Sequence, residues 1–239
     1  GYGLRLLQVM GLLKYFPELE ALVDCPQDPI WHPEGDVWTH TLMVVDEAAK
    51  LRTGDRDHDL VLMFGALCHD LGKPRTTTFE VNGEEVTREQ YEAAPLHLYL
   101  PETTWEERGE STTRPKIRSK QHEAAGATPT RAFMERLTAS NDLITAVIAL
   151  VVDHLAPHTY MKNKAKASAF RRLARKLGEA GTNLEMLHKI GTADHFGRST
   201  PDAASGQYPA GDWFLEKATT LEIKEEGPAD VVMGRHLIA

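Results

Sequence analysis

The chain has 239 residues, a formal net charge of -8 at pH 7 and an apolar fraction of 41%. These values predict one folded domain with a sizeable core, and the acidic balance excludes a surface that attracts nucleic acid over its whole extent. The only two cysteines, Cys25 and Cys68, exclude a disulfide framework, so we expect a reducing, cytoplasmic setting. No apolar run approaches the roughly 20 residues of a membrane span, and no signal-peptide pattern begins the chain.

Apolar residues recur at helical spacing through most of the chain, which predicts a mostly α fold with a single core. The expected helices cover residues 3–14, 36–51, 60–71, 122–137, 143–154, 166–177, 184–196 and 213–221. Asp36 is expected to cap the second helix, and Gly72 with Pro74 to end the third. Residues 143–152 are nearly all apolar, which indicates a central helix.

One segment departs from this helical pattern. Residues 76–87 place β-forming residues on both sides of Asn82-Gly83, which predicts a small β-hairpin with a tight turn. Residues 88–120 are polar and rich in proline, so we expect a partly irregular flap. The segment 76–120 would then be an insertion in a single domain over residues 1–239, whose residues 199–239 hold a last helix and a tail.

Histidine and aspartate side chains stand at the ends or on the apolar faces of successive helices. An uncharged run leads directly into His69 and Asp70, and burying two titratable groups is costly unless a partner such as a divalent cation satisfies them. For this pair alone, a hydrogen-bonded cap on a core helix is an equal alternative. Comparable residues recur elsewhere, namely His40, His122, His154 and Asp194. Converging helices could bring these side chains onto a common metal.

The residue types restrict the metal. Imidazole and carboxylate groups without a thiolate suit Mn²⁺, Fe²⁺, Co²⁺, Ni²⁺ or Zn²⁺, and also Mg²⁺. The sequence sets neither the identity of the metal nor whether one or two ions bind.

These residues lie in stretches that resemble the HD-domain superfamily of metal-dependent phosphohydrolases. The stretches are HPEGDVWTHTL at 32–42, HDLGKP at 69–74, HEAAGA at 122–127, VDH at 152–154 and ADHFGR at 193–198. They define a motif-bearing core of residues 32–198, and the closest likeness is to the HD domain of bacterial tRNA nucleotidyltransferases, the CCA-adding enzymes. Those enzymes carry a nucleotidyl-transfer head with a Gly-Ser loop and an Asp-x-Asp. This sequence shows no such head, so we do not expect it to add nucleotides by itself.

The resemblance implies a helical HD bundle with a first metal held by four residues. These are His40, His69, Asp70 and Asp194. In the family, the histidines that correspond to His122 and His154 add a second metal or contact phosphate.

The resemblance also implies hydrolysis of phosphomonoesters, 2′,3′-cyclic phosphates or nucleotides. Asp70 would bridge two ions or orient the attacking water. Lys73 and Arg198 would balance charge on the phosphate, although a solvated lysine and a surface arginine are equal alternatives. His122 or His154 would protonate the leaving oxygen if metal does not occupy it.

Residues 161–176 form a basic segment without an acidic residue. Its members are Lys162, Lys164, Lys166, Arg171, Arg172, Arg175 and Lys176. This segment could follow a nucleic-acid backbone such as a tRNA acceptor end, or it could be a solvated helix face.

Two other functions stay open from the sequence alone. A non-catalytic RNA-binding module of a tRNA-maturing enzyme would bind RNA without hydrolysis. An HD-type dNTP triphosphohydrolase would release tripolyphosphate or pyrophosphate from dNTPs.

Overall fold

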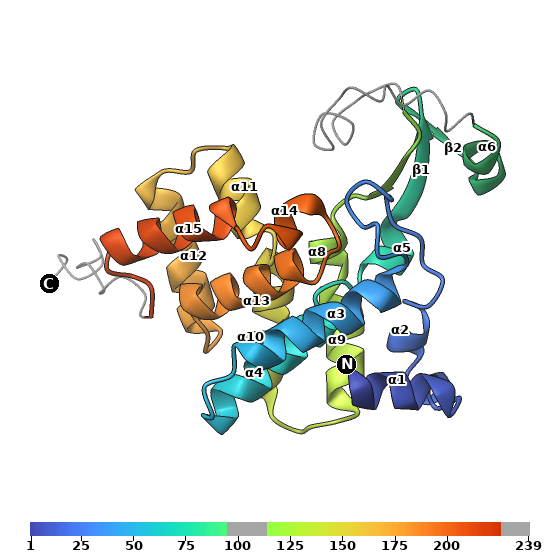
Figure 1. Ribbon diagram of the computed structural model, residues 1–239. Helices are drawn as coiled ribbons and strands as arrows, with labels where there is room; N and C mark the ends of the chain where they lie inside the picture. The colour runs from blue at the N-terminus through green and yellow to red at the C-terminus, as the bar shows by residue number, and fades with distance from the viewer. Residues whose placement is uncertain (95–113, 226–239) are drawn as a thin grey trace, which may run out of the picture.

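Within residues 1–94 and 114–225, which the computed structural model describes, four long helices form the centre of the fold (Figure 1). They are α3 (Val37–Lys50), α4 (Arg56–Cys68), α10 (Asn141–Asp153) and α13 (Leu184–Phe196). Helix α13 packs against α3 and α4, and α10 packs against α4. The core is therefore built by helices from both halves of the chain, and the expected mostly α bundle is confirmed.

A polar side chain caps the start of each central helix. Asp36 accepts the Thr39 N–H at 2.9 Å, as expected for α3. Asp55 accepts the His58 N–H at 2.9 Å, so α4 begins at Arg56 and the expected charged turn is in part helical. The caps of α10 and α13 are Ser140 and Asn183. Since such a cap satisfies a backbone donor that the helix leaves open, these residues fix where the helices begin.

The N-terminal helix is shorter than its apolar pattern predicts. Helix α1 (Tyr2–Val9) ends before Gly11, whose φ of 67° turns the chain, and η1 (Leu13–Tyr15) and α2 (Pro17–Glu20) follow. Helix α1 is joined to α3 by the Trp38 indole N–H, which donates to Gln8 Oε1 at 2.8 Å. Glycine adopts such a positive φ without strain, and the sequence pattern alone did not predict a break there.

A three-stranded antiparallel sheet projects from the helices in the described part of the chain (Figure 1). It comprises β1 (Thr77–Val81), β2 (Glu84–Val86) and β3 (Lys116–Ser119), in the order β2-β1-β3. The expected hairpin turn is present, with φ of 53° at Asn82 and 83° at Gly83. The pairing of β3 with β1 was not expected, because β3 is short, polar and distant in sequence. Helix α6 (Arg88–Ala93) follows β2, and the rest of the expected flap, 95–113, lies outside the described residues.

Further helices complete the second half of the chain. They are α8 (His122–Ala125), α9 (Ala127–Glu135), α11 (Ala156–Lys162), α12 (Ala167–Glu179), α14 (Pro201–Ala204) and α15 (Pro209–Thr220). Helix α11 was not expected, and α15 begins four residues earlier than expected, with Pro209 in its first turn. The expected tail beyond residue 225 lies outside the described residues.

Among the described residues, one stretch, Asn141–Lys162, has the length and apolar composition of a membrane span, with a hydropathy of 1.3. Half of the most apolar 18 residues of this stretch is buried inside the fold. No such stretch was predicted from the sequence, in which Asp153 and His154 interrupt the apolar run. A core helix of a globular protein has the same properties, so this stretch is weak evidence for a membrane.

Gly72 is required by close packing and not by a helix end. Helix α4 ends at Cys68, so the expected C-cap role of Gly72 is wrong; its φ of -80° is ordinary. A Cβ atom at Gly72 would lie 2.0 Å from the His122 carbonyl oxygen and 2.7 Å from the Gly126 nitrogen. The turn after α4 therefore touches the backbone of α8 directly.

We expect Gly72→Ala to lower the free energy of unfolding by about 1–3 kcal/mol or more, because the obstructing atoms are backbone and cannot move cheaply. The matched control is Gly178→Ala in α12, where a Cβ would meet nothing within 4 Å. The control should change stability by less than about 1 kcal/mol, in the stabilising direction. Urea denaturation of both variants tests this, and wild-type stability of Gly72→Ala would contradict it.

Candidate metal centre

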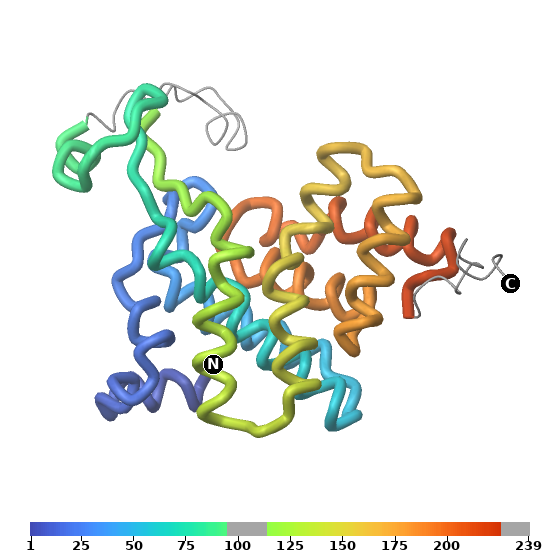
Figure 2. The backbone as a smooth tube through the Cα atoms, turned by 180° about the vertical axis from the view of Figure 1, so that it is seen from behind, coloured from blue at the N-terminus to red at the C-terminus, as the bar shows by residue number. Residues whose placement is uncertain are grey.

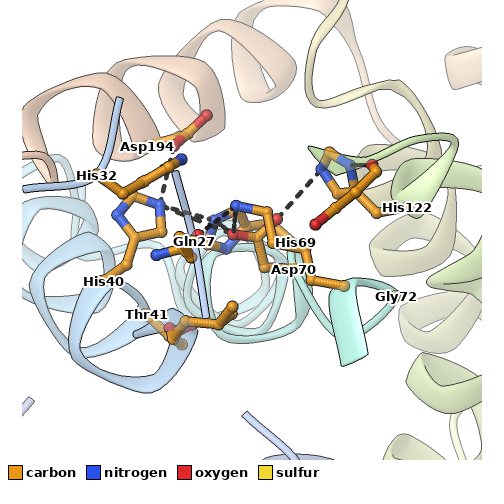
Figure 3. Close-up of polar contacts among 12 residues, drawn as sticks. Gln27, His32, His40, Thr41, His69, Asp70, Gly72, His122 and Asp194 are labelled. Carbon is orange, nitrogen blue, oxygen red and sulfur yellow. Dashed lines mark hydrogen bonds and ion pairs between the residues drawn. The ribbon is translucent and has the colours of Figure 1, made fainter. Parts of the chain in front are cut away.

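The six side chains proposed as metal ligands from the sequence lie together at one end of the central helices, and Figure 3 labels all of them except His154. They are His40 of α3, His69 and Asp70 after α4, His122 of α8, His154 after α10 and Asp194 of α13. Each is more than nine-tenths buried. The structure therefore assembles residues that are up to 154 positions apart in the sequence.

Two of the histidines directly follow a helix, and a carbonyl of the last helical turn fixes which ring nitrogen carries the hydrogen. His69 directly follows α4, and its Nδ1 lies 2.8 Å from the Ala66 carbonyl oxygen. His154 directly follows α10, and its Nδ1 lies 2.7 Å from the Val151 carbonyl oxygen. Carbonyls in the last turn of a helix lack a helical partner and can only accept. Each Nδ1 therefore carries the hydrogen, and in the neutral ring the lone pair lies on Nε2.

His122 is fixed in the same way by strand β3. Its Nδ1 lies 2.8 Å from the carbonyl oxygen of Ser119, the last residue of that strand. Gln121, between them, has a left-handed backbone with φ of 59°, which turns the chain from the strand into α8. The sheet thus sets the position of one histidine of the site.

His40 differs because its Nδ1 faces a carboxylate as well as a backbone carbonyl. Its Nδ1 lies 2.9 Å from Glu34 Oε1 and 3.3 Å from the Gly197 carbonyl oxygen. Its Nε2 lies 3.1 Å from Asp194 Oδ1. Burial opposes the charged ring, but the hydrogen bonds to Asp194 and Glu34 raise the pKa of His40. His40 can therefore hold a proton on Nε2, which a divalent ion would replace.

The imidazole Nε2 atoms converge on the two oxygens of Asp70. Oδ1 lies 3.2 Å from His122 Nε2 and 4.0 Å from His154 Nε2. Oδ2 lies 3.2 Å from His69 Nε2 and 3.8 Å from His40 Nε2. Figure 3 shows Asp70 between the two sets of rings. Asp70 therefore divides the cluster into two halves.

The side chains of the cluster leave some of their polar atoms without hydrogen bonds. Neither oxygen of Asp70 has a hydrogen bond of acceptable geometry from the described residues. The Nε2 atoms of His122 and His154 are 3.3 Å apart, so two lone pairs face each other. A cation beside each Asp70 oxygen would satisfy these atoms, and the donors around each are close enough, within 4.8 Å of one another. The residues present therefore fit divalent metal.

The charge states also suit metal binding. Burial would raise the pKa of Asp70, but His69 and Lys73 hold it well below its usual range. Burial would likewise raise the pKa of Asp194, but Arg198 and His40 hold it well below its usual range. Burial and the nearby His122 lower the pKa of His154 to about 3. Near neutral pH both carboxylates are thus ionised and His154 is neutral, as metal ligands must be.

Two cations expected to meet phosphate also lie at the cluster. The Lys73 side chain is 9% exposed, and its Nζ lies 2.7 Å from Asp70 Oδ2 and donates to Gln27 Oε1 at 2.6 Å. It is therefore not a solvated lysine. The half-buried Arg198 guanidinium lies 3.7 Å from Asp194 Oδ2. Both positive charges sit beside the carboxylates of the centre.

Three polar residues of the site were not assigned a role from the sequence. Gln27, His32 and Glu34 all belong to the loop before α3. Burial and the nearby Lys73 lower the pKa of His32 to about 3, and its ring centroid lies 4.6 Å from that of His40. His32 and Glu34 lie in the HPEGD stretch, which carried the resemblance to the family, but the sequence assigned neither of them a chemical role. Gln27 had no signal, because only the fold brings it to Lys73.

The basic segment lies away from the metal centre. Its residues occupy the end of α11, the following turn and α12, which lies at the opposite end of the molecule from the sheet (Figures 1 and 2). Helix α12 buries Phe170, Leu173, Ala174 and Leu177 and exposes its basic residues. Lys176 is paired with Asp153 at 2.6 Å. The segment is therefore a separate surface and adds nothing to the metal cluster.

Comparison with known proteins agrees with this geometry. The HD domain family model matches residues 37–185, more than half of the chain. The Multifunctional CCA protein of Xylella fastidiosa (strain 9a5c) is 29% identical over 211 residues, covering 85% of this chain and 39% of that protein. The same-named protein of Halorhodospira halophila (strain DSM 244 / SL1) is 29% identical over 213 residues, covering 89% and 41%. That of Methylococcus capsulatus is 49% identical over 73 residues, covering 30% and 16%.

This chain spans about two fifths of the length of the first two relatives. The family match covers four of the clustered histidines and Asp70, and the longer alignments extend the likeness over most of the chain. The chain belongs to the HD domain family.

Proposed function

We propose that this chain is a metal-dependent phosphohydrolase whose centre holds two divalent ions bridged by Asp70. His40, His69 and Asp194 would complete the first half of the centre, and His122 and His154 the second half. The observation that carries the proposal is the convergence of imidazole Nε2 atoms on the two buried oxygens of Asp70, which have an ion pair with Lys73 but no hydrogen bond of acceptable geometry from the described residues. A structural histidine cluster would leave these lone pairs unsatisfied, whereas metal would use them.

The donor set narrows the metal. Imidazole and carboxylate ligands suit Mn²⁺, Ni²⁺, Co²⁺, Fe²⁺ or Zn²⁺, with Mg²⁺ the weaker match. Among the described residues, neither cysteine belongs to the ligand groups. Cys68 is buried elsewhere in the core, and burial raises the pKa of its thiol well above the usual range, so it stays protonated.

The side chains around the ligands suit phosphoester hydrolysis. Bound divalent ions supply charge stabilisation at a phosphoryl oxygen and make water a nucleophile near neutral pH. Lys73 and Arg198 place positive charge beside the centre, where phosphate charge would develop. His154, with a pKa of about 3, is better suited to binding metal than to donating a proton to the leaving oxygen.

The names of the relatives support a proposal for the substrate class. They are named Multifunctional CCA protein, so we propose substrates at RNA ends or related nucleotides: 2′,3′-cyclic phosphates and phosphomonoesters. A dNTP triphosphohydrolase would use the same ligands, so the products decide between the two.

The proposal predicts how many ions bind. We expect the wild-type protein, stripped with chelator, to bind two Mn²⁺ ions, and Asp70→Asn to bind neither tightly, because both halves share this carboxylate. Isothermal titration calorimetry measures this. The matched control is Asp153→Asn, next to His154 in sequence but paired with Lys176, which should bind like the wild type. Wild-type binding by Asp70→Asn would contradict the shared bridge.

The proposal also predicts turnover. With Mn²⁺, Ni²⁺, Co²⁺ or Mg²⁺, we expect hydrolysis of a 2′,3′-cyclic nucleotide and of p-nitrophenyl phosphate, and a loss in Asp70→Asn of at least about 100-fold. Lys73→Ala should lower kcat/KM by about 10- to 100-fold through the lost charge, while the surface variant Lys50→Ala should not. Release of tripolyphosphate from dNTPs would favour the triphosphohydrolase. Absence of any turnover that depends on Asp70 would contradict an enzymatic function.

A second candidate function, RNA contact, is favoured by the exposed basic face of α12. We expect a triple charge reversal, Arg171→Glu, Arg172→Glu and Arg175→Glu, to weaken binding of a tRNA acceptor-stem RNA and to flatten its dependence on salt. Fluorescence anisotropy at several salt concentrations measures both. The control reverses Arg131, which faces solvent on α9. Equal RNA affinity of the triple variant and the wild type would show that this face is only solvated.

A further inference from the structure

Three hydrogen-bond donors converge on the carboxylate of Glu34. His32 Nδ1 and His40 Nδ1 each lie 2.9 Å from its Oε1, and the Ser199 N–H donates to its Oε2 at 3.0 Å. The Glu34 side chain is 2% exposed. A carboxylate can only accept, so its closeness favours a hydrogen on Nδ1 of both imidazoles. The Nδ1 of His32 is hydrogen-bonded to Glu34, whereas the Nδ1 of His40 is hydrogen-bonded to the Gly197 carbonyl oxygen and has Glu34 as a close charged neighbour. Figure 3 shows His32 beside His40 and Asp194.

The position of His40 in its helix explains why a side chain is needed there. His69 and His154 follow helix ends and His122 follows a strand, and each finds a backbone carbonyl three residues earlier. His40 lies inside α3, where the helix's own hydrogen bonds use the carbonyls. Its backbone acceptor, the Gly197 carbonyl oxygen, is more distant at 3.3 Å. Glu34 therefore places a charged acceptor closer to His40 Nδ1 than the backbone carbonyl to which that nitrogen is hydrogen-bonded.

A carboxylate has a stronger effect than a carbonyl on an imidazole that binds metal. A carboxylate on the far nitrogen of a metal-binding imidazole fixes the ring and increases its basicity as a ligand. The contact to Ser199 also ties the loop before α3 to the segment that follows Asp194. One side chain thus contacts His40 and links two of the three elements that carry the ligands of the first half.

The group His32, Glu34 and His40 has the spacing of a metal site of its own. Its 2.9 Å contacts are those of ordinary hydrogen bonds, however, and a metal there would have to displace the Nδ1 hydrogen of His40. The geometry therefore favours hydrogen bonding over a third ion.

We propose that Glu34 is a positioning residue for the first half of the centre, and that it selectively raises the affinity of this half for a divalent ion by holding His40 with Nε2 directed at the metal. The second half, with His122 and His154, would not depend on it. This inference rests on the proposed two-metal function.

The test is Glu34→Gln, which keeps the shape of the side chain. An amide presents one donor and one acceptor, so it cannot accept from both histidines and from Ser199 together. We expect calorimetry with Mn²⁺ to show one ion bound about 10- to 100-fold more weakly and the other unchanged. Glu34→Asp keeps the charge with a shorter reach and should weaken the same ion by a smaller factor.

The matched control is Glu123→Gln on the second half. Glu123 Oε2 lies 3.5 Å from His122 Nδ1, but the hydrogen of that nitrogen is already donated to Ser119 at 2.8 Å. We therefore expect no change in either ion. ¹⁵N NMR of the histidine rings in the metal-free protein gives a second readout. It should show altered His40 nitrogens in Glu34→Gln and unaltered His69, His122 and His154.

The outcomes separate this inference from the function on which it rests. If Glu34→Gln binds both ions like the wild type and the His40 signals do not change, the inference is wrong and the metal function stands. Equal weakening of both ions in Glu34→Gln and Glu34→Asp would overturn the assignment to one half. If the wild-type protein binds no divalent ion, the function and the inferred affinity effect both fail, and the NMR result alone decides whether Glu34 sets the His40 tautomer.

Discussion

The carboxylate of Asp70 constrains the rest of this structure. A buried charge is tolerated only where other groups compensate it, and here four imidazoles and the Lys73 ammonium face its two oxygens. To supply three of these imidazoles, α3, α4 and α10 bring one end or one face to the same place, and α8 supplies the fourth. The packing of these helices therefore meets a polar requirement as well as burying the apolar core.

The same local arrangement positions three of these imidazoles. A helix of apolar residues ends, the next residue is histidine, and its Nδ1 hydrogen returns to a carbonyl of the last turn; α4 and α10 both do this. The carbonyl needs a donor in any case, so one hydrogen bond closes the helix and aims Nε2 outward. The strand β3 achieves the same with Ser119. Hydrogen bonds to backbone carbonyls three residues earlier thus direct the Nε2 lone pairs of these rings.

Most of this site could be predicted because its ligands stand next to strong local signals. Asp36 as a cap, residues 184–196 as a helix and Asn82-Gly83 as a turn are all decided by neighbouring residues. The gathering of His40, His69 and Asp194 followed from their recurrence at helix ends and faces. The pairing of β3 with β1, the tight contact at Gly72 and the contacts of Gln27 and Glu34 could not be predicted, because each depends on residues distant in sequence. The sequence signals for charge were also ambiguous: only the fold distinguishes Lys73, buried at Asp70, from an ordinary exposed lysine.

The two halves of the centre are supported by different secondary-structure elements. The ligands of the first half come from α3, the end of α4 and α13, and Glu34 ties the loop before α3 to the segment after α13. The second half depends on the sheet, because His122 follows β3, whose Ser119 hydroxyl lies 2.9 Å from that of Thr77 in β1, and because Gly72 lets α8 approach closely. The sheet is therefore a structural support of the second half. Change in the sheet can alter the second half alone, whereas change at Asp70 acts on both.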